Sequence, residues 1–151
     1  MNGADAVCVD ACVAVKLVLS EPESEIARRL WLNWLDEDVV IWVPSLFFWE
    51  CAHAVRGAYL RGDCDRTTAS EAVAAIADLP VTVLPDLHSG LADIWERFVA
   101  GFDHQVSAYD AAYLAAGAFA GCELWTADER LLRNVGSRLP WVRSLGEAAV
   151  E

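Results

Sequence analysis

Short runs of consecutive apolar residues, many of them β-branched, alternate along the chain with longer segments in which apolar residues recur every three or four positions. The first pattern is typical of strands that are covered on both faces, and the second is typical of amphipathic helices. The apolar runs predict strands at VCVD (7–10), VVIWV (39–43), VTVL (81–84), ELWT (123–126) and a shorter WVRSL (141–145).

The periodic segments predict helices between these strands. In the segment 21–37, Ile26, Leu30 and Trp34 fall on one face of a helix. Further helices are predicted from Ala11 onward, from a Ser45 cap to about Leu60, at 65–79 before Pro80, at 87–101, from Ser107 to near Gly121, and to Arg133. Strands that alternate with helices indicate an α/β domain with a mostly parallel sheet of four to five strands, here one domain over residues 1–151.

Composition narrows the class of protein. No apolar stretch reaches the roughly 18 residues of a membrane-spanning helix, and Asp5, Asp10 and Lys16 interrupt any signal-peptide core. We therefore expect a cytoplasmic protein with no membrane association. The five cysteines form no C-x-x-C pair, so we expect reduced, buried thiols rather than a disulfide framework or a zinc site.

The formal net charge of −12 argues against a protein that coats nucleic acid, because phosphate binding normally appears as a basic excess. Two alternatives are compatible with it, namely a basic partner and a cluster of acids around cations. Total charge does not decide between them.

Four acids stand at positions that raise the question of a site: Asp10 in VCVDACVAVK, Glu50 in SLFFWECAHAVR, Asp110 in SAYDAAYLAAG and Asp128 in TADERLL. Several have a purely structural explanation. Asp10 is a good N-cap, Ser107-x-x-Asp110 resembles a capping box, and Thr126 or Asp128 is a suitable cap for the last helix. Glu50 lies about five residues into its helix, too late to cap it, and so favours a functional role.

The combination of acids is more specific than any one of them. Asp10 and Asp128 lie at or just after the carboxyl ends of predicted strands, where ligands bind in open parallel sheets. Three or four carboxylates in one place raise one another's pKa values unless cations lie among them. Oxygen ligands favour Mg²⁺ or Mn²⁺ over zinc. The pattern therefore predicts a metal site for phosphodiester hydrolysis.

Four motifs in this order resemble PIN-domain ribonucleases, most closely the VapC-type toxins of toxin–antitoxin pairs. The resemblance rests on VCVDACVAVK, VPSLFFWECAHAV, SAYDAAYLAAG and WTADERLL, and it covers nearly the whole chain. It implies a three-layer fold and a hydrolase that cleaves RNA with Mg²⁺ or Mn²⁺. It makes Asp10, Glu50, Asp110 and Asp128 the catalytic and metal-binding residues. Thr126 looks like the hydroxyl residue of the family's T-x-D element, which positions Asp128 or a metal-bound water.

The resemblance also implies a cognate antitoxin with a basic and apolar tail, and a homodimer. One residue departs from the pattern, because many relatives carry Asn where this chain has His53. We expect a helix histidine rather than a metal ligand there, and an inactive PIN-fold interaction module is the alternative function. Two other classes are set aside. An aspartyl phosphatase needs a second Asp two residues after Asp10, where this chain has Cys12, and a response-regulator receiver needs an acidic pair near the end of the first strand, which this chain lacks.

Two expectations concern the surface. Trp31 and Trp34 lie in the early helix that relatives use to grip the antitoxin, so one of them is expected to be exposed. Contact with RNA would involve Lys16, Arg130 and Arg133, although an ordinary solvated face is the favoured interpretation of these cations.

Overall fold

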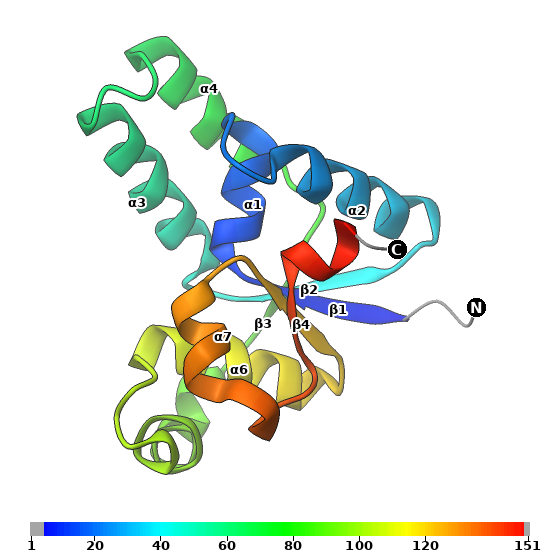
Figure 1. Ribbon diagram of the computed structural model, residues 1–151, viewed down its shortest axis with the longest axis vertical. Coiled ribbons are helices and arrows are strands. Elements are labelled where there is room, and N and C mark those ends of the chain that lie inside the picture. Colours follow the sequence, from blue (N-terminus) through cyan, green and yellow to red (C-terminus); the bar gives the residue numbers. More distant parts are fainter. Residues whose placement is uncertain (1–4, 150–151) are drawn as a thin grey trace.

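The computed structural model describes residues 5–149 and contains one five-stranded sheet in the order β3-β2-β1-β4-β5 (Figure 1). Its strands are β1 (Ala6–Val9), β2 (Val40–Pro44), β3 (Thr82–Leu84), β4 (Glu123–Thr126) and β5 (Val142–Ser144). All neighbouring strands run parallel. The predicted α/β class and parallel sheet are confirmed, and each strand begins and ends within one residue of its predicted position.

Helices cover both faces of the sheet and give the molecule three layers (Figure 1). They are α1 (Ala11–Val18), α2 (Ser24–Asp36), α3 (Phe47–Leu60), α4 (Arg66–Ala77), α5 (Leu91–Ile94), α6 (Ala108–Ala120) and α7 (Glu129–Val135). The pair α1 and α2 lies on one side, and α6 and α7 lie on the other. Helices α3 and α4 pack against each other and project as a hairpin beyond the sheet.

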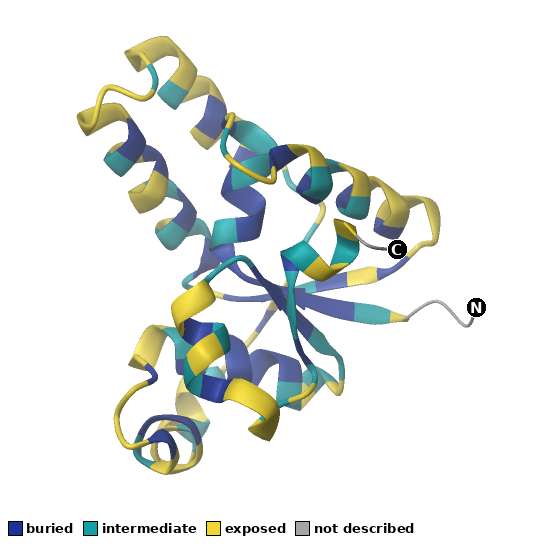
Figure 2. Ribbon diagram, viewed as in Figure 1, coloured by how far each residue is buried: buried dark blue, intermediate teal, exposed yellow. Residues whose placement is uncertain are grey.

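Buried side chains concentrate in the sheet and on the helix faces turned toward it, while the outward faces are exposed (Figure 2). Strand β1 contributes to both sides: Val7 and Val9 join a core with α2, and Cys8 joins the core with α6. Such an alternating, doubly buried strand has a continuous apolar sequence. This is why β1 is recognisable from the sequence.

A chain of edge-to-face tryptophans fills the core on the α2 side. Trp34 lies between Trp31 and Trp125, with ring centroids 6.2 Å and 5.9 Å away. The expectation that Trp31 or Trp34 would be exposed is wrong, because both are buried in this stack. Trp49 and Trp95 are the exposed tryptophans of the described chain.

The start of helix α3 differs from the prediction. Helix α3 begins at Phe47 after a Leu46 N-cap without a side-chain hydrogen bond, so Ser45 is not the cap. The turn that follows Pro44 takes up both Ser45 and Leu46 before the helix starts.

The segment 87–101, predicted as one helix, is broken into η1 (Leu87–Gly90), α5, a π-helical turn η2 (Trp95–Val99) and η3 (Ala100–Phe102). Within the π-helical turn the neighbours Phe98 and Val99 are both buried.

The cysteines are all free thiols. Cys8 and Cys51 are buried as expected, whereas Cys12, Cys64 and Cys122 are only partly buried. No helix in residues 5–149 has both the length and the apolar character needed to cross a membrane.

The strand order places a ligand-binding crevice beside β1. The chain passes from β1 to β2 and β3 on one side and then returns to β4 on the other. Open parallel sheets bind ligands outside the carboxyl ends of their strands, at the point where this order reverses. Val9 pairs with Trp125 in register, so the residues that follow them, Asp10 and Thr126, emerge side by side.

Candidate active site

The four predicted acids line one open cleft of about 590 Å³ at the carboxyl edge of the sheet. Asp10 follows β1 and Asp128 follows β4, while Glu50 and Asp110 lie in the first turns of α3 and α6. Figure 1 shows α3 on one side of this edge and α6 with α7 on the other. The rest of the lining is Ala11, Cys12, Leu46, Trp49, His53, Ala54 and Tyr109.

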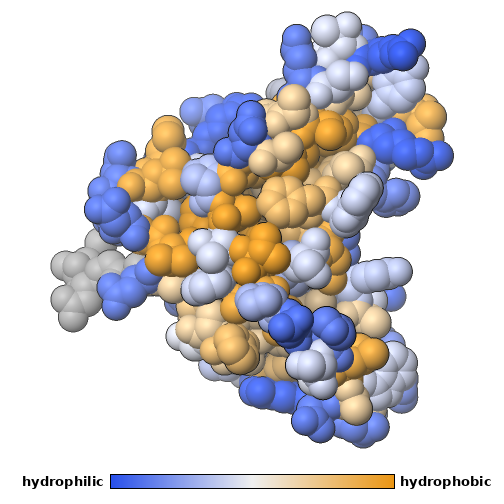
Figure 3. Space-filling model, turned by 180° about the vertical axis from the view of Figure 1, so that it is seen from behind, coloured by the Kyte–Doolittle hydropathy of each residue, from blue (hydrophilic) through white to orange (hydrophobic). Residues whose placement is uncertain are grey.

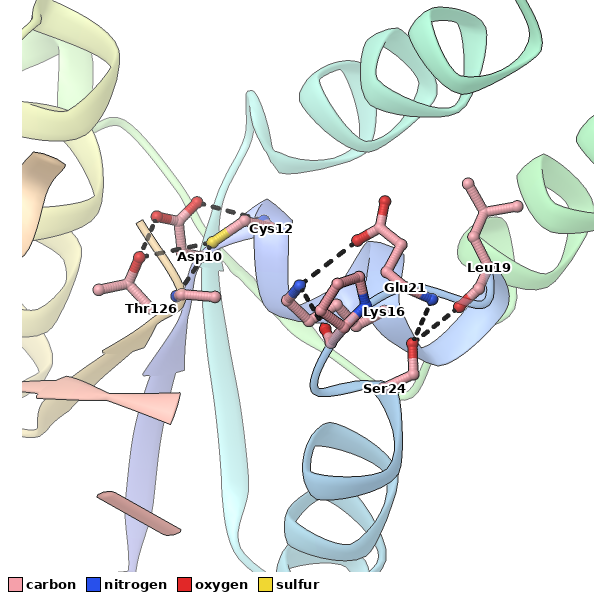
Figure 4. A network of polar contacts seen from close by, with 9 residues as sticks. Asp10, Cys12, Lys16, Leu19, Glu21, Ser24 and Thr126 are labelled. Atoms are coloured by element: carbon pink, nitrogen blue, oxygen red, sulfur yellow. Dashed lines mark hydrogen bonds and ion pairs between the residues drawn. The ribbon is translucent and has the colours of Figure 1, made fainter. Parts of the chain in front are cut away.

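Asp10 is fixed by three hydrogen bonds. Its backbone N–H donates to the carbonyl of Trp125 (3.0 Å), and its carboxylate accepts from the backbone N–H of Cys12 (3.5 Å) and the hydroxyl of Thr126 (2.8 Å; Figure 4). The residue is the N-cap of α1 and is only 6% exposed. It therefore caps a helix and lines the cleft at once.

The buried hydroxyl of Thr126 joins two of the acids. Its Oγ1 donates to Asp10 Oδ2 and accepts from the backbone N–H of Asp128 at 3.0 Å. Asp128 in turn caps α7 by accepting from the backbone N–H groups of Arg130 and Leu131. Of the two capping alternatives, Asp128 is thus the cap, and Thr126 holds the ends of β1 and β4 together.

Cys12 belongs to the same network, which residue-by-residue inspection of the sequence missed (Figure 4). Its Sγ lies 3.4 Å from Thr126 Oγ1 and accepts from the backbone N–H of Ala127 at 3.3 Å. Because the hydroxyl proton of Thr126 goes to Asp10, the thiol is the donor toward Thr126. Cys12 thus supports the turn that carries Asp128.

The two remaining acids come from helix starts. Ser107 caps α6 by accepting from the backbone N–H of Asp110 at 3.0 Å, as the S-x-x-D spacing predicts. Burial raises the pKa of the Asp110 carboxyl, the side chain of Ser107 lowers it, and the charge of Asp128 raises it. Burial likewise raises the pKa of Glu50, which Tyr113 and His53 lower and Asp110 raises.

The four acids form one electrostatic group. Burial raises the pKa of Asp10 to about 7; the hydrogen bond from Thr126 opposes this, and the charges of Asp110 and Glu50 add to it. Asp110 also interacts with Asp128. Carboxylates that raise one another's pKa values in this way repel one another, and a cation in the cleft would relieve that repulsion.

Tyr113 is a second residue that the sequence did not single out. It is fully buried on α6, and its hydroxyl has no hydrogen-bond partner of good geometry among the described residues. The same hydroxyl nevertheless lies near enough to Glu50 to lower the pKa of that carboxyl. A buried donor beside an acid is suited to bind the carboxylate form.

The cleft suits a hard divalent cation in chemistry, although it is not a finished ligand cage. Its acids offer carboxylate oxygens, which Mg²⁺ and Mn²⁺ prefer, and a cation would relieve the repulsion that raises their pKa values. Within residues 5–149, no three His, Cys, Asp or Glu side chains are already gathered as a metal-binding group. Mg²⁺ commonly uses one or two carboxylates and keeps several waters, so the open arrangement fits it.

The other residues expected near a substrate are arranged differently. Lys16 donates to the carbonyl of Pro22 (2.8 Å) and pairs with Glu21 (3.5 Å), so its ammonium closes the α1–α2 turn (Figure 4). The Lys16 ammonium is therefore already engaged and is not free for the expected contact with RNA. Arg130 is exposed and its charge lowers the pKa of Asp110, so it lies near the cleft. Arg133 is an exposed residue of α7.

Comparison with known proteins gives two findings. A family model described as "PIN domain" matches residues 7–137, well over half of the chain. The chain is also similar to the crystal structure of PAE2754 from Pyrobaculum aerophilum, with a TM-score of 0.67, 19% sequence identity, and coverage of 97% of this chain and 96% of that one. At this identity the structural likeness supports the fold. No curated protein matches the sequence.

Proposed function

This chain belongs to the PIN-domain family, whose members are generally nucleases that use divalent metal ions, and on that premise we propose that it is a Mg²⁺- or Mn²⁺-dependent endoribonuclease. We further propose that it is a VapC-type toxin whose activity a cognate antitoxin inhibits. The second part of the proposal extends the family resemblance of the four sequence motifs.

The observation that carries the nuclease proposal is the meeting of four acids in one cleft. They come from four separate parts of the chain, and three of them have pKa values raised by burial and by one another. Burying carboxylates together costs free energy, and none of the ion pairs among the described residues includes one of these four acids. A cation held by Asp10, Glu50, Asp110 and Asp128 would supply that pairing, polarise a phosphate oxygen and activate water.

The chain's own residues hold this site in place. Thr126 fixes Asp10 and Asp128 relative to each other, and Cys12 supports the turn between them. Tyr113, buried on α6, lies beside Glu50. Positioning of this kind lowers the reorganisation needed when a phosphodiester enters, which is a main source of catalytic power in such sites.

The test is RNA cleavage by purified protein freed of any partner. We expect cleavage with Mg²⁺ or Mn²⁺, none with EDTA, and at least about a hundredfold loss in Asp110→Asn, since removing one well-placed stabilising group costs about that much. The control is Asp93→Asn, an exposed acid on α5 outside the cleft. Cleavage that persists in EDTA, or in Asp110→Asn, would show that the acids do not act through a metal.

The alternative is a PIN-fold interaction module with weak or no activity. His53 favours it, because it lines the cleft where many relatives carry Asn. A module of this kind would bind its partner normally, yet EDTA and Asp110→Asn would change nothing in any assay of the protein.

The proposed partner is a small protein with a basic and apolar tail. A basic side chain suits the acids of the cleft, and apolar residues suit the exposed Leu32 and Leu35 of α2. Hydrophobic side chains also gather over the middle of the face in Figure 3, between hydrophilic ends. We propose that the complex is built on a homodimer of this chain, as is common in the family.

A further inference from the structure

Two strongly exposed aromatic side chains line the acidic cleft from opposite helices. Trp49 of α3 is 80% exposed and Tyr109 of α6 is 67% exposed. Each one directly precedes a cleft acid, Glu50 or Asp110. A single exposed aromatic residue is ordinary on a protein surface, but these two share one cleft with four carboxylates.

Neither side chain is explained by folding. An aromatic side chain stabilises a fold by removing 150–250 Å² of surface from water, at about 25 cal/mol per Å². At 80% and 67% exposure, Trp49 and Tyr109 gain only a small part of this. Their free faces are therefore available to a ligand, and truncating them should leave the fold intact.

The charges of the cleft restrict what can hold a nucleic acid there. No Lys or Arg is among the residues that line it in the described chain, and Lys16 is already paired with Glu21. The whole chain carries −12. Proteins usually bind a polyanion through many Lys and Arg contacts to phosphate, whereas among the described residues this cleft has Arg130 near Asp110 and no Lys or Arg in its lining.

We propose that Trp49 and Tyr109 are base-stacking platforms on either side of the reacting phosphate, each binding the face of one unpaired base. This inference rests on the proposed nuclease function. Stacking of a base on an aromatic ring contributes about 1–3 kcal/mol and needs no positive charge. Bases inside a duplex are already stacked and paired, so a double-stranded RNA offers the two rings nothing to bind.

Binding and cleavage of a fluorescein-labelled single-stranded RNA of about a dozen nucleotides provide the test. Binding is followed by anisotropy in EDTA, and cleavage is followed with Mg²⁺. We expect Trp49→Ala and Tyr109→Ala each to weaken binding and raise KM by about 5- to 150-fold, the equivalent of one lost stacking contact, with kcat little changed. Trp49→Phe, which keeps a ring, should recover most of the affinity.

The chain offers matched controls. Tyr59 is an exposed aromatic residue farther along α3, and Phe119 is one farther along α6. Tyr59→Ala and Phe119→Ala should bind and cut like the wild type. The same RNA annealed to its complement should bind much more weakly. The slope of log K against log salt should be shallow, because each phosphate neutralised by a cation adds only about 0.7 and few are available here.

The experiment distinguishes failure of the proposed nuclease function from failure of the stacking proposal. Wild-type protein that neither binds nor cuts any RNA would overturn the proposed function itself. Wild-type protein that cuts RNA, while Trp49→Ala and Tyr109→Ala keep its KM and affinity, would overturn only the stacking proposal. The stacking proposal also fails if the two variants lose binding of a partner protein and keep RNA binding, because the rings would then form a protein-docking surface.

Discussion

Asp10 combines a structural and a chemical function in a single carboxylate. It caps α1, accepts the hydroxyl of Thr126, and faces three other acids while only 6% exposed. Capping alone does not require burial beside like charges, since most helix caps are solvated. The cost of this position falls on the metal-free protein, and it can be measured there.

The pKa of Asp10 gives this cost a direction. Burial raises its pKa from 3.8 to about 7 in the folded chain, so the native state holds its proton more tightly than the unfolded state. Stability from this group is present below about pH 4 and is lost as pH rises toward 7. In EDTA, the wild type should lose about 2 kcal/mol of unfolding free energy relative to Asp10→Asn as the pH is raised from 5 to 8.

Urea unfolding of both proteins at the two pH values is the measurement. Adding Mg²⁺ or Mn²⁺ at pH 8 should then stabilise the wild type and leave Asp10→Asn nearly unchanged. Asp93→Asn should follow the wild type throughout. Parallel stability curves for Asp10→Asn and the wild type would mean that burial does not penalise the charged carboxylate.

At the scale of elements, the site depends on how strand ends are joined to helix starts. The hydroxyl of Thr126 bridges Asp10 at the end of β1 and the backbone of Asp128 after β4. These are the two neighbouring strands at which the strand order reverses. One buried hydroxyl thus sets the spacing of two walls of the cleft.

Replacing Thr126 with Val keeps its shape and removes this bridge. The change leaves a carboxylate oxygen and a backbone N–H without their partner, which costs about 1–3 kcal/mol of stability. RNA cleavage should fall more than the stability change explains, because Asp10 and Asp128 lose their mutual position. Thr126→Ser keeps the hydroxyl and should restore most of both. Full cleavage by a folded Thr126→Val protein would exclude this positioning role.

The elements that the sequence predicts well are those specified by local pattern. The apolar runs of β1 and β4 identify the strands because a doubly covered strand has no polar face. The acids at strand and helix ends are recognisable because they stand out against these apolar residues. Segment 87–102 is not, since its division into 3₁₀, α-helical and π-helical turns is not evident from the spacing of its apolar residues.

The residues that support the site could not be identified from the sequence for a different reason. Cys12 contacts Thr126 and Ala127 across more than a hundred positions of the chain, and a cysteine with no partner motif resembles a small hydrophobic residue. Tyr113 resembles one more apolar position of α6. The exposure of Trp49 and the burial of Trp31 are decided by packing between distant elements, which local pattern does not contain.

At the scale of the whole molecule, the chain carries a net charge of −12, and four of its 23 acids meet in the cleft at one edge of the sheet. Such a cleft is a well of negative potential that attracts cations. The same potential favours a basic side chain of the proposed antitoxin, while exposed apolar side chains favour its apolar tail.

The complex of this chain with its co-expressed proposed antitoxin should therefore persist as the salt concentration is raised. Buried charges are screened much less than exposed ones, and apolar contact is not screened at all. Size-exclusion chromatography at low and high salt would detect the complex and its size. A complex that separates at moderate salt, or a chain that is monomeric with and without its partner, would contradict the proposed assembly.

The position of β1 between β2 and β4 has a consequence for the order in which the molecule is made. During synthesis β1, β2 and β3 are made before β4, and one side of β1 then remains an open edge with unpaired backbone groups. Strand β4 fills that edge only when residues 123–126 have been made, and Thr126 and Asp128 come with it. Asp10 is made early, whereas its partner Thr126 follows 116 residues later. The nascent protein thus has no complete cleft until β4 and the residues directly after it have left the ribosome.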